Sequence, residues 1–264
     1  MAQEEKAIAV FDSGVGGISV LRELVKLMPN ENFIYFGDSA HAPYGTKTIE
    51  EVYQLSIHNI EYLMKQGIKA VVIACNTVTS VAIDDLRDTY TNIPIIGVEP
   101  ALKPAVIHKE HGRVLVMATP ITIHEHKFSK LMDTYRRMAD VIPLPCGGLA
   151  DLVEEGKIEG PEVEAYLEEL LAPYLEPKLD AVVLGCTHYP FAKEAISKVI
   201  GYEVEFFDGG VGTARETKRR LEQKGWLNPK QEQGKVTMLN SLNDERMQEL
   251  SYQLLESQKE YKRL

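Results

Sequence analysis

The sequence predicts an α/β protein made of two similar α/β domains with mostly parallel central sheets, related by an internal pseudo-repeat and enclosing the functional site in a cleft between them. Three observations support this prediction. Apolar runs of strand length alternate with segments of helical period, which is typical of parallel sheets. Most runs are continuously apolar, as in strands covered on both faces. Finally, AVVIACNT at 70–77 returns as AVVLGCTH at 181–188.

Eight strands are predicted from apolar runs rich in β-branched residues, at 7–11, 32–37, 70–74, 93–98, 113–118, 139–145, 181–185 and 203–207. Two of the intervening helices carry clear end signals. One opens with a capping box formed by Thr48 and Glu51 and stops at Gly67. The other covers 161–177 and starts at Pro161, a residue favoured in the first helical turn. The apolar stripes of both helices are interpreted as core.

Aligning the chain on the two cysteine motifs brings its two halves into step. Each half then reads strand–helix, strand–loop–helix, strand–Cys–helix and strand–helix. We predict a first domain from residues 1–97 plus 207–264 and a second domain from residues 98–206. A further strand and amphipathic helix within 235–257 have no counterpart in the repeat, and we expect them to pack on the first domain.

Composition and charge exclude several classes of protein. The chain has 264 residues, 44% of them apolar, and a net charge of -10 from 39 acidic and 29 basic residues. No Lys or Arg block is long enough to follow a phosphate backbone, so nucleic acid is not an expected partner. No apolar segment reaches the roughly 20 residues that cross a membrane, and the N-terminus lacks a secretory signal. We therefore expect a cytoplasmic protein with three reduced thiols, at Cys75, Cys146 and Cys186.

Polar side chains follow the two repeated strands, at the sheet edge where parallel sheets bind ligands. The first motif supplies Cys75, Asn76 and Thr77, and the second supplies Cys186, Thr187 and His188. We expect these two groups to face one another, with a thiol on each wall of one cleft. A helix N-terminus or a nearby cation can lower the pKa of a thiol, so both thiols are expected to form thiolates. His188 is a candidate to relay protons to Cys186, and Asp12 is a candidate to serve Cys75.

Two opposed thiols without an evident cofactor suit the inversion of a stereocentre by proton transfer. One group removes a proton from one face while the other delivers a proton to the opposite face, so each acts as acid and as base. The negative charge that develops at carbon requires donors around the substrate carboxylate, expected from Ser13, Asn76, Thr77 and Thr187. The segment FDSGVGG at 11–17 matches neither common nucleotide-binding loop. It is interpreted as a tight turn that binds a small carboxylate.

Five ordered motifs resemble the bacterial glutamate racemase family, within the wider group of cofactor-independent aspartate and glutamate racemases. They are FDSGVGGISVLREL, YFGDSAHAPYGTK, ACNTVTS, GVEPALKPA and LGCTHYPF, and the resemblance extends over about residues 7–220. It implies interconversion of L-glutamate and D-glutamate, supplying D-glutamate for peptidoglycan. It also implies a homodimer that uses neither pyridoxal phosphate nor metal.

The resemblance further implies roles for individual residues. Cys75 is expected to deprotonate D-glutamate and Cys186 to deprotonate the L enantiomer. The implied helper residues are Asp12, His188 and Glu154, although the adjacent Glu155 leaves the last assignment open. The implied substrate contacts are Asp12, Ser13, Tyr44, Gly45, Asn76, Thr77, Thr119, Thr122, Thr187 and His188.

The chain departs from the family pattern after Thr122 and in VTMLNS at 236–241, which puts peripheral contacts and oligomer packing in question. Three alternatives stay open. The two thiols could act on aspartate or another amino acid, the chain could bind an amino acid without catalysis, or the thiols could form a redox pair, which the absence of C-x-x-C disfavours. Cys146 is interpreted as a small buried hydrophobe. Surface positions rather than a zinc site are expected for His41, His58, His108, His111, His124 and His126.

Overall fold

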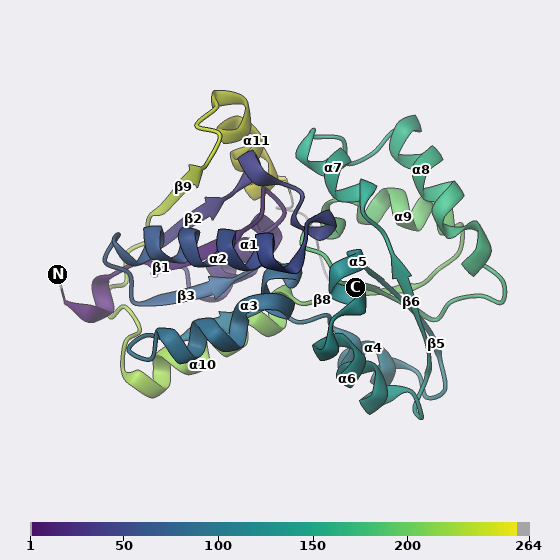
Figure 1. Ribbon diagram of the computed structural model, residues 1–264, viewed down its shortest axis with the longest axis horizontal. Helices are drawn as coiled ribbons and strands as arrows, with labels where there is room; N and C mark the ends of the chain where they lie inside the picture. Colours follow the sequence, from purple (N-terminus) through teal and green to yellow (C-terminus); the bar gives the residue numbers. More distant parts are fainter. Residues whose placement is uncertain (1, 258–264) are drawn as a thin grey trace.

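The computed structural model describes residues 2–257 and contains two parallel sheets (Figure 1). The first sheet has five strands in the order β4-β3-β1-β2-β9, and every neighbouring pair is parallel. Its strands are β1 (Ile8–Asp12), β2 (Phe33–Gly37), β3 (Ala70–Ile73), β4 (Ile95–Gly97) and β9 (Val236–Asn240).

The second sheet has four parallel strands in the order β6-β5-β7-β8. They are β5 (Arg113–Ala118), β6 (Asp140–Pro145), β7 (Ala181–Leu184) and β8 (Glu205–Asp208). All eight predicted strands are therefore confirmed. The first four strands of the chain and the next four follow the same order, fourth-third-first-second, so the pseudo-repeat is a repeat of topology. Strand β8 spans the predicted domain boundary at 206/207 and belongs to the second sheet; the domain limits stay a prediction.

Helices cover both faces of each sheet (Figure 1). Those that follow the first three strands are α1 (Ile18–Leu27), α2 (Ile49–Met64) and α3 (Asn76–Thr89). Those of the second half are α5 (Pro120–His124), α6 (His126–Tyr135), α7 (Gly148–Glu154), α8 (Pro161–Leu171) and α9 (Lys193–Ile200). Short 3-10 turns lie at η1 (Gln3–Glu5), η2 (Ser39–His41), η3 (Tyr44–Thr46), η4 (Ala172–Tyr174) and η5 (Tyr189–Ala192).

The two helices with predicted end signals form largely as expected. Helix α2 begins with the complete Thr48–Glu51 capping box, and the chain leaves it through Gly67 in the left-handed region, at φ 70°. Helix α8 has Pro161 in its first turn but ends at Leu171, short of the predicted 177. Pro173 explains the early end, because proline lacks the N–H donor of an interior helical turn and its ring clashes with the preceding turn.

Alternate residues of each strand point into different cores, as predicted for sheets covered on both faces. In β1, Ile8 and Val10 pack with α1, whereas Ala9 and Phe11 pack with α2 and α3. In β7, Val182 and Val183 likewise belong to separate cores. Within residues 2–257, no helix is long and apolar enough to cross a membrane.

Two helices are exchanged between the halves (Figure 1). Helix α4 (Leu102–His108) follows β4 of the first sheet but packs on β7 and β8 of the second. Helix α10 (Gly210–Lys224) follows β8 but packs against α1 of the first. The two crossings touch, because a Cβ placed on Gly209 would lie 2.6 Å from the Glu99 carbonyl oxygen.

The C-terminal strand and helix join the first sheet, as expected. Strand β9 pairs with β2, and α11 (Glu245–Glu256) packs on α1.

Candidate active site

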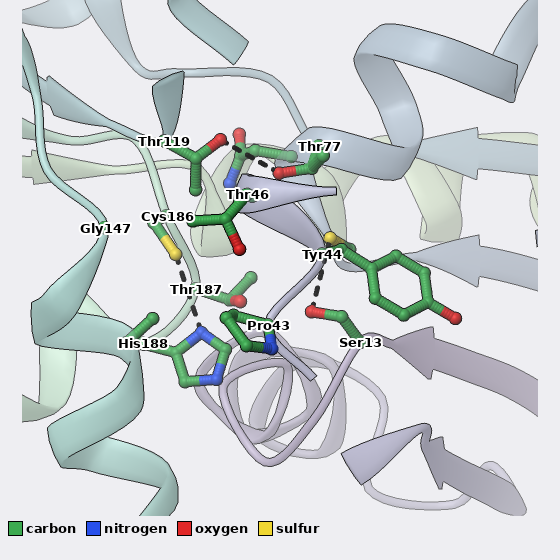
Figure 2. Close-up of a pocket in the computed structure, with 14 residues that line it drawn as sticks. Ser13, Pro43, Tyr44, Thr46, Thr77, Thr119, Gly147, Cys186, Thr187 and His188 are labelled. Carbon is green, nitrogen blue, oxygen red and sulfur yellow. Dashed lines mark hydrogen bonds between the residues drawn. The ribbon is translucent and has the colours of Figure 1, made fainter. Parts of the chain in front are cut away.

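A small cavity lies between the two halves, at the carboxyl ends of the repeated strands (Figure 2). Both motif cysteines reach it, from opposite domains. Its free volume is about 20 Å³, roughly the room for one water molecule. The residues that line it are Ser13, Pro43, Tyr44, Gly45, Thr46, Cys75, Asn76, Thr77, Thr119, Gly147, Ala150, Cys186, Thr187 and His188. None of them is Lys or Arg, so His188 is the one lining side chain that can carry a positive charge.

The Cys75 side of the cavity is held by the start of α3. Cys75 is the N-cap residue of that helix, and its Sγ lies 3.6 Å from the hydroxyl oxygen of Ser13. Burial and the nearby Asp12 carboxylate nevertheless raise the pKa of the Cys75 thiol to about 12, outweighing the hydrogen bonds from the Val78 N–H and Ser13. The expectation that Cys75 readily forms a thiolate is therefore wrong for the closed cleft, where desolvation outweighs the helix N-terminus.

The Cys186 side is built differently. Its Sγ lies 3.5 Å from Nδ1 of His188 (Figure 2). Nε2 of His188 lies 2.6 Å from Oε1 of Glu154. A carboxylate only accepts hydrogen bonds, so Nε2 carries the proton in this pair. Burial alone would lower the pKa of His188, but Cys186 and Glu154 raise it well above its usual value. The buried imidazolium is thus held between a sulfur and a carboxylate.

The chain after Cys186 departs from the expected helix start. Residues Tyr189–Ala192 form the 3-10 turn η5, and α9 begins only at Lys193. Pro190 lies in that turn. Cys186 therefore relies on His188 for a cationic neighbour, whereas Cys75 meets a helix N-terminus directly.

Asp12 lies under the cavity at the end of β1 and does not line it. Its Oδ2 accepts hydrogen bonds from the N–H groups of Gly17, at 2.9 Å, and Gly14, at 3.3 Å, while Oδ1 accepts one from the Thr187 hydroxyl at 3.2 Å. Burial raises its pKa despite these donors and the nearby His188. Asp12 thus contacts the Cys186 segment through Thr187, and it acts on Cys75 by raising the pKa of that thiol electrostatically.

The glycines of FDSGVGG give these residues room. A Cβ on Gly14 would lie 1.8 Å from Oε1 of Glu154, and one on Gly16 would lie 2.4 Å from Nδ1 of His188. A side chain on either glycine would displace its neighbour. The motif is the tight turn predicted, and close approach of the second domain accounts for its glycines.

Two hydroxyl clusters complete the cavity wall. Thr119 Oγ1 lies 3.0 Å from Thr77 Oγ1 and donates to Thr122 Oγ1 at 2.9 Å, joining the two domains. Thr122 therefore supports Thr119 from behind rather than lining the cavity. Tyr44 donates to Asp38 Oδ2 at 2.6 Å, and Asn59 also donates to that oxygen at 2.9 Å.

One polar atom at the site has no hydrogen-bond partner. Among the residues described, Oδ1 of Asn76 is buried without a donor. Buried acceptors are normally satisfied, and Asn76 lines the cavity. This oxygen is therefore available to an N–H group of a ligand.

The structure brings together ten of the predicted site residues as cavity lining and keeps Asp12, Thr122 and Glu154 one layer behind. Glu154 contacts His188, whereas Glu155 pairs with Lys157 at the surface, so the geometry favours Glu154 of the two acids. Sequence reasoning missed the lining residues Pro43, Thr46, Gly147 and Ala150, and the supporting Asp38 and Ser39. The polar run GDSAH before the Tyr44 motif was an available signal for the last two.

The residues interpreted as non-catalytic do not line the cavity. Cys146 is buried in the second core, and its Sγ lies 3.5 Å from the Leu144 carbonyl oxygen. The six other histidines are exposed, as expected.

Comparisons with known proteins give one consistent result. A family model described as Asp/Glu/Hydantoin racemase matches residues 8–217. A glutamate racemase of Clostridium perfringens is 52% identical over 94% of this chain and 96% of its own. The crystal structure of a Francisella tularensis glutamate racemase in complex with D-glutamate superposes with a TM-score of 0.82 at 30% identity, covering 96% of this chain and 94% of that one. A Thermus thermophilus glutamate racemase, in complex with beta-chloro-D-alanine, gives 0.77 at 35% identity and covers 95% and 93%.

Proposed function

Because the chain belongs to the Asp/Glu/hydantoin racemase family, it is an isomerase, and we propose that its cleft interconverts L-glutamate and D-glutamate by two-base proton transfer at the α-carbon. The observation that carries this proposal is the pair of thiols, Cys75 and Cys186, that reach one cavity from opposite domains. The names of the relatives, at 52% identity over nearly the whole chain, support glutamate as the substrate.

In the L to D direction, Cys186 removes the α-proton and Cys75 delivers one to the opposite face. The surroundings of the two thiols suit these roles. His188 stabilises a thiolate at Cys186, because its imidazolium is hydrogen-bonded to Glu154 and faces the sulfur. The raised pKa of Cys75 keeps that thiol protonated and ready to act as the acid.

In the D to L direction, Cys75 must first become the base. The ammonium group of bound glutamate is a cation beside a buried thiol, and a nearby opposite charge lowers the pKa of an acid. Asn76 supports this placement, since its unpartnered Oδ1 can accept a hydrogen bond from the ammonium. Substrate binding thereby supplies a positive charge beside Cys75.

The carboxylates of glutamate would be held mainly by hydroxyl groups and backbone N–H groups. Hydroxyl groups lining the cavity come from both domains, at Ser13, Thr77, Thr119 and Thr187. The first N–H groups of α3 add backbone donors beside Cys75. Such fixed donors stabilise the charge that develops as the α-proton leaves.

The test is racemisation by the purified protein without added cofactor. L-glutamate is incubated with the protein, and its optical rotation is expected to fall to zero. Cys75→Ser and Cys186→Ser should each lose at least roughly 10³-fold in kcat, the scale of a lost acid or base. Cys146→Ala is the matched control, because that thiol lies in the core, and it should retain turnover.

Three results would contradict the proposal. Near-normal turnover by either cysteine variant in both directions would exclude the two-thiol scheme. Turnover of aspartate but not glutamate would move the activity to a sister enzyme. Tight glutamate binding without loss of rotation would indicate a binding protein. We further propose that the enzyme acts in the cytoplasm as a homodimer and supplies D-glutamate for peptidoglycan; the acidic composition and the free thiols are compatible with this setting.

A further inference from the structure

The carboxylate of Glu154 sits at the end of a hydrogen-bond chain that reaches the C-terminal strand. Its Oε1 accepts from His188 and, at 2.7 Å, from the Val15 N–H. Its Oε2 accepts from the Ser39 hydroxyl at 3.0 Å. Ser39 Oγ in turn accepts from Nδ2 of Asn240 at 2.9 Å. This series of hydrogen bonds therefore runs from the last residue of β9 through η2 to α7, and crosses from the first domain to the second.

The direction of these hydrogen bonds follows from chemistry. Oδ1 of Asn240 accepts from the Leu242 N–H at 2.9 Å, which fixes the amide with its NH₂ group toward Ser39. Because Ser39 Oγ accepts from this group, its own hydrogen is left to donate to Glu154. Asn240 thus orients the hydroxyl, and the hydroxyl fixes the second oxygen of the carboxylate.

We propose that Asn240 and Ser39 are positioning residues that hold Glu154 against His188 and so support the Cys186 half of the reaction in particular. The proposal rests on the proposed two-base function. Its asymmetry comes from the contacts: the chain ends on His188 and Cys186, whereas Cys75 is held by Ser13 and the start of α3. Strand β9 has no counterpart in the repeat, so it adds support to one thiol alone.

The charged groups around His188 determine how its pKa responds when Glu154 is held less firmly. The titratable groups that face this imidazole are Cys186 on its own segment, Glu154 and Asp151 on α7, and Asp12 on β1. All four favour the imidazolium when they are ionised. When Glu154 is free to move, its hydrogen bond to His188 weakens. The imidazolium then loses its proton at lower pH.

The variants are Asn240→Asp and Ser39→Ala, with Asn228→Asp as the matched control. Asn240→Asp is isosteric and keeps the acceptor for the Leu242 N–H, but its carboxylate draws the Ser39 hydroxyl away from Glu154. Asn228 makes the same local pattern, since Oδ1 accepts from the Lys230 N–H and Nδ2 donates to a backbone oxygen, that of Asn30. It lies outside the Glu154 chain, so the control reports the structural effect of the same substitution.

Turnover and isotope effects give the first readout. We expect kcat/KM to fall about tenfold for Asn240→Asp and Ser39→Ala, the scale of one hydrogen bond to a charged group, and equally in both directions because the enantiomers have equal free energy. The α-deuterium isotope effect should rise with L-glutamate, which Cys186 deprotonates, and fall with D-glutamate. The double variant should be no worse than either single variant. Unchanged isotope effects, or equal changes in Asn228→Asp, would overturn the proposal.

Titration of His188 by NMR gives a second readout that needs no substrate. Ser39→Ala should lower its apparent pKa, and Asn240→Asp should lower it less, because the added negative charge favours the imidazolium. Asn228→Asp should leave it unchanged. If the parent protein fails to racemise glutamate, the proposed function fails, while this titration still decides whether Asn240 and Ser39 act on His188. A His188 pKa that is the same in all four proteins would refute the positioning role.

Discussion

Cys75 and Cys186 occupy matching places in the repeat and meet different neighbours. Cys75 is a buried thiol beside Ser13 and a helix start, and its pKa is raised to about 12. Cys186 faces a buried imidazolium. The two repeated motifs therefore place their thiols in electrostatically different surroundings.

Asp12 gives a prediction about stability against pH. Burial raises its pKa in the folded protein above the unfolded value of about 3.9. The stability linked to its protonated form is complete below that unfolded value and is lost as pH rises through the folded pKa. Asp12→Asn removes this loss, so the variant should be more stable than the parent at pH 7, with no difference below about pH 4.

The measurement is thermal unfolding of both proteins across this pH range. Activity should fall at least tenfold, because the variant loses the negative charge that faces His188. A variant that is less stable than the parent at pH 7 would show that the hydrogen bonds from Gly17 and Thr187, rather than burial, dominate at this carboxylate.

At the scale of elements, the turn between β1 and α1 packs tightly against Glu154. A methyl group on Gly14 would overlap Oε1 of Glu154, since the built Cβ lies 1.8 Å away. Gly14→Ala should therefore push Glu154 off His188 and lower kcat/KM by about 10² or more, as expected when catalytic groups are displaced by an ångström. Steady-state kinetics of the two directions measure this.

Gly212 offers the matched control for Gly14. It lies inside α10, and a Cβ there would meet nothing within 4 Å. Gly212→Ala should stabilise the protein by about 1 kcal/mol through helix propensity and leave turnover unchanged. Equal activity of the Gly14 and Gly212 variants would mean that Glu154 can move without consequence for catalysis.

Sequence patterns predicted the elements well and the supporting contacts poorly. The strands were predictable because apolar runs ending in polar residues mark buried parallel strands, and the repeated cysteines marked the cleft. The role of Ser39 was not predictable from the sequence, because it depends on Asn240 of β9. That strand lies about 200 residues later in the chain and pairs with β2. The raised pKa of Cys75 also escaped prediction, since a motif indicates a helix start but not how completely the thiol is desolvated.

At the scale of the whole molecule, the cavity implies movement of the domains. Its volume of about 20 Å³ admits roughly one water molecule, so an amino acid enters only when the two halves separate and close again. Gly45 of the first half packs against Thr119 of the second, and a Cβ on Gly45 would lie 2.6 Å from Cγ2 of Thr119. The added methyl group of Gly45→Ala should clash with Thr119 and prevent the two halves from closing fully.

The expected result for Gly45→Ala is a fall of at least tenfold in kcat/KM and a larger radius of gyration in solution scattering with glutamate present. Gly147→Ala is the control on the opposite wall, because its Cβ would meet Thr46 at an ordinary 3.7 Å. If the Gly45 variant closes around glutamate as the parent does, the contact with Thr119 is not what limits closure.

The exchange of α4 and α10, together with the late position of β9, sets the order in which the chain can fold during synthesis. The second sheet has all its strands once residue 208 has been made, whereas the first waits until residue 240. The apolar stripe of α1 is covered by α10 and α11, which are complete only at residues 224 and 256. The half that leaves the ribosome first is therefore finished last, and it is the part of the newborn chain most exposed to aggregation.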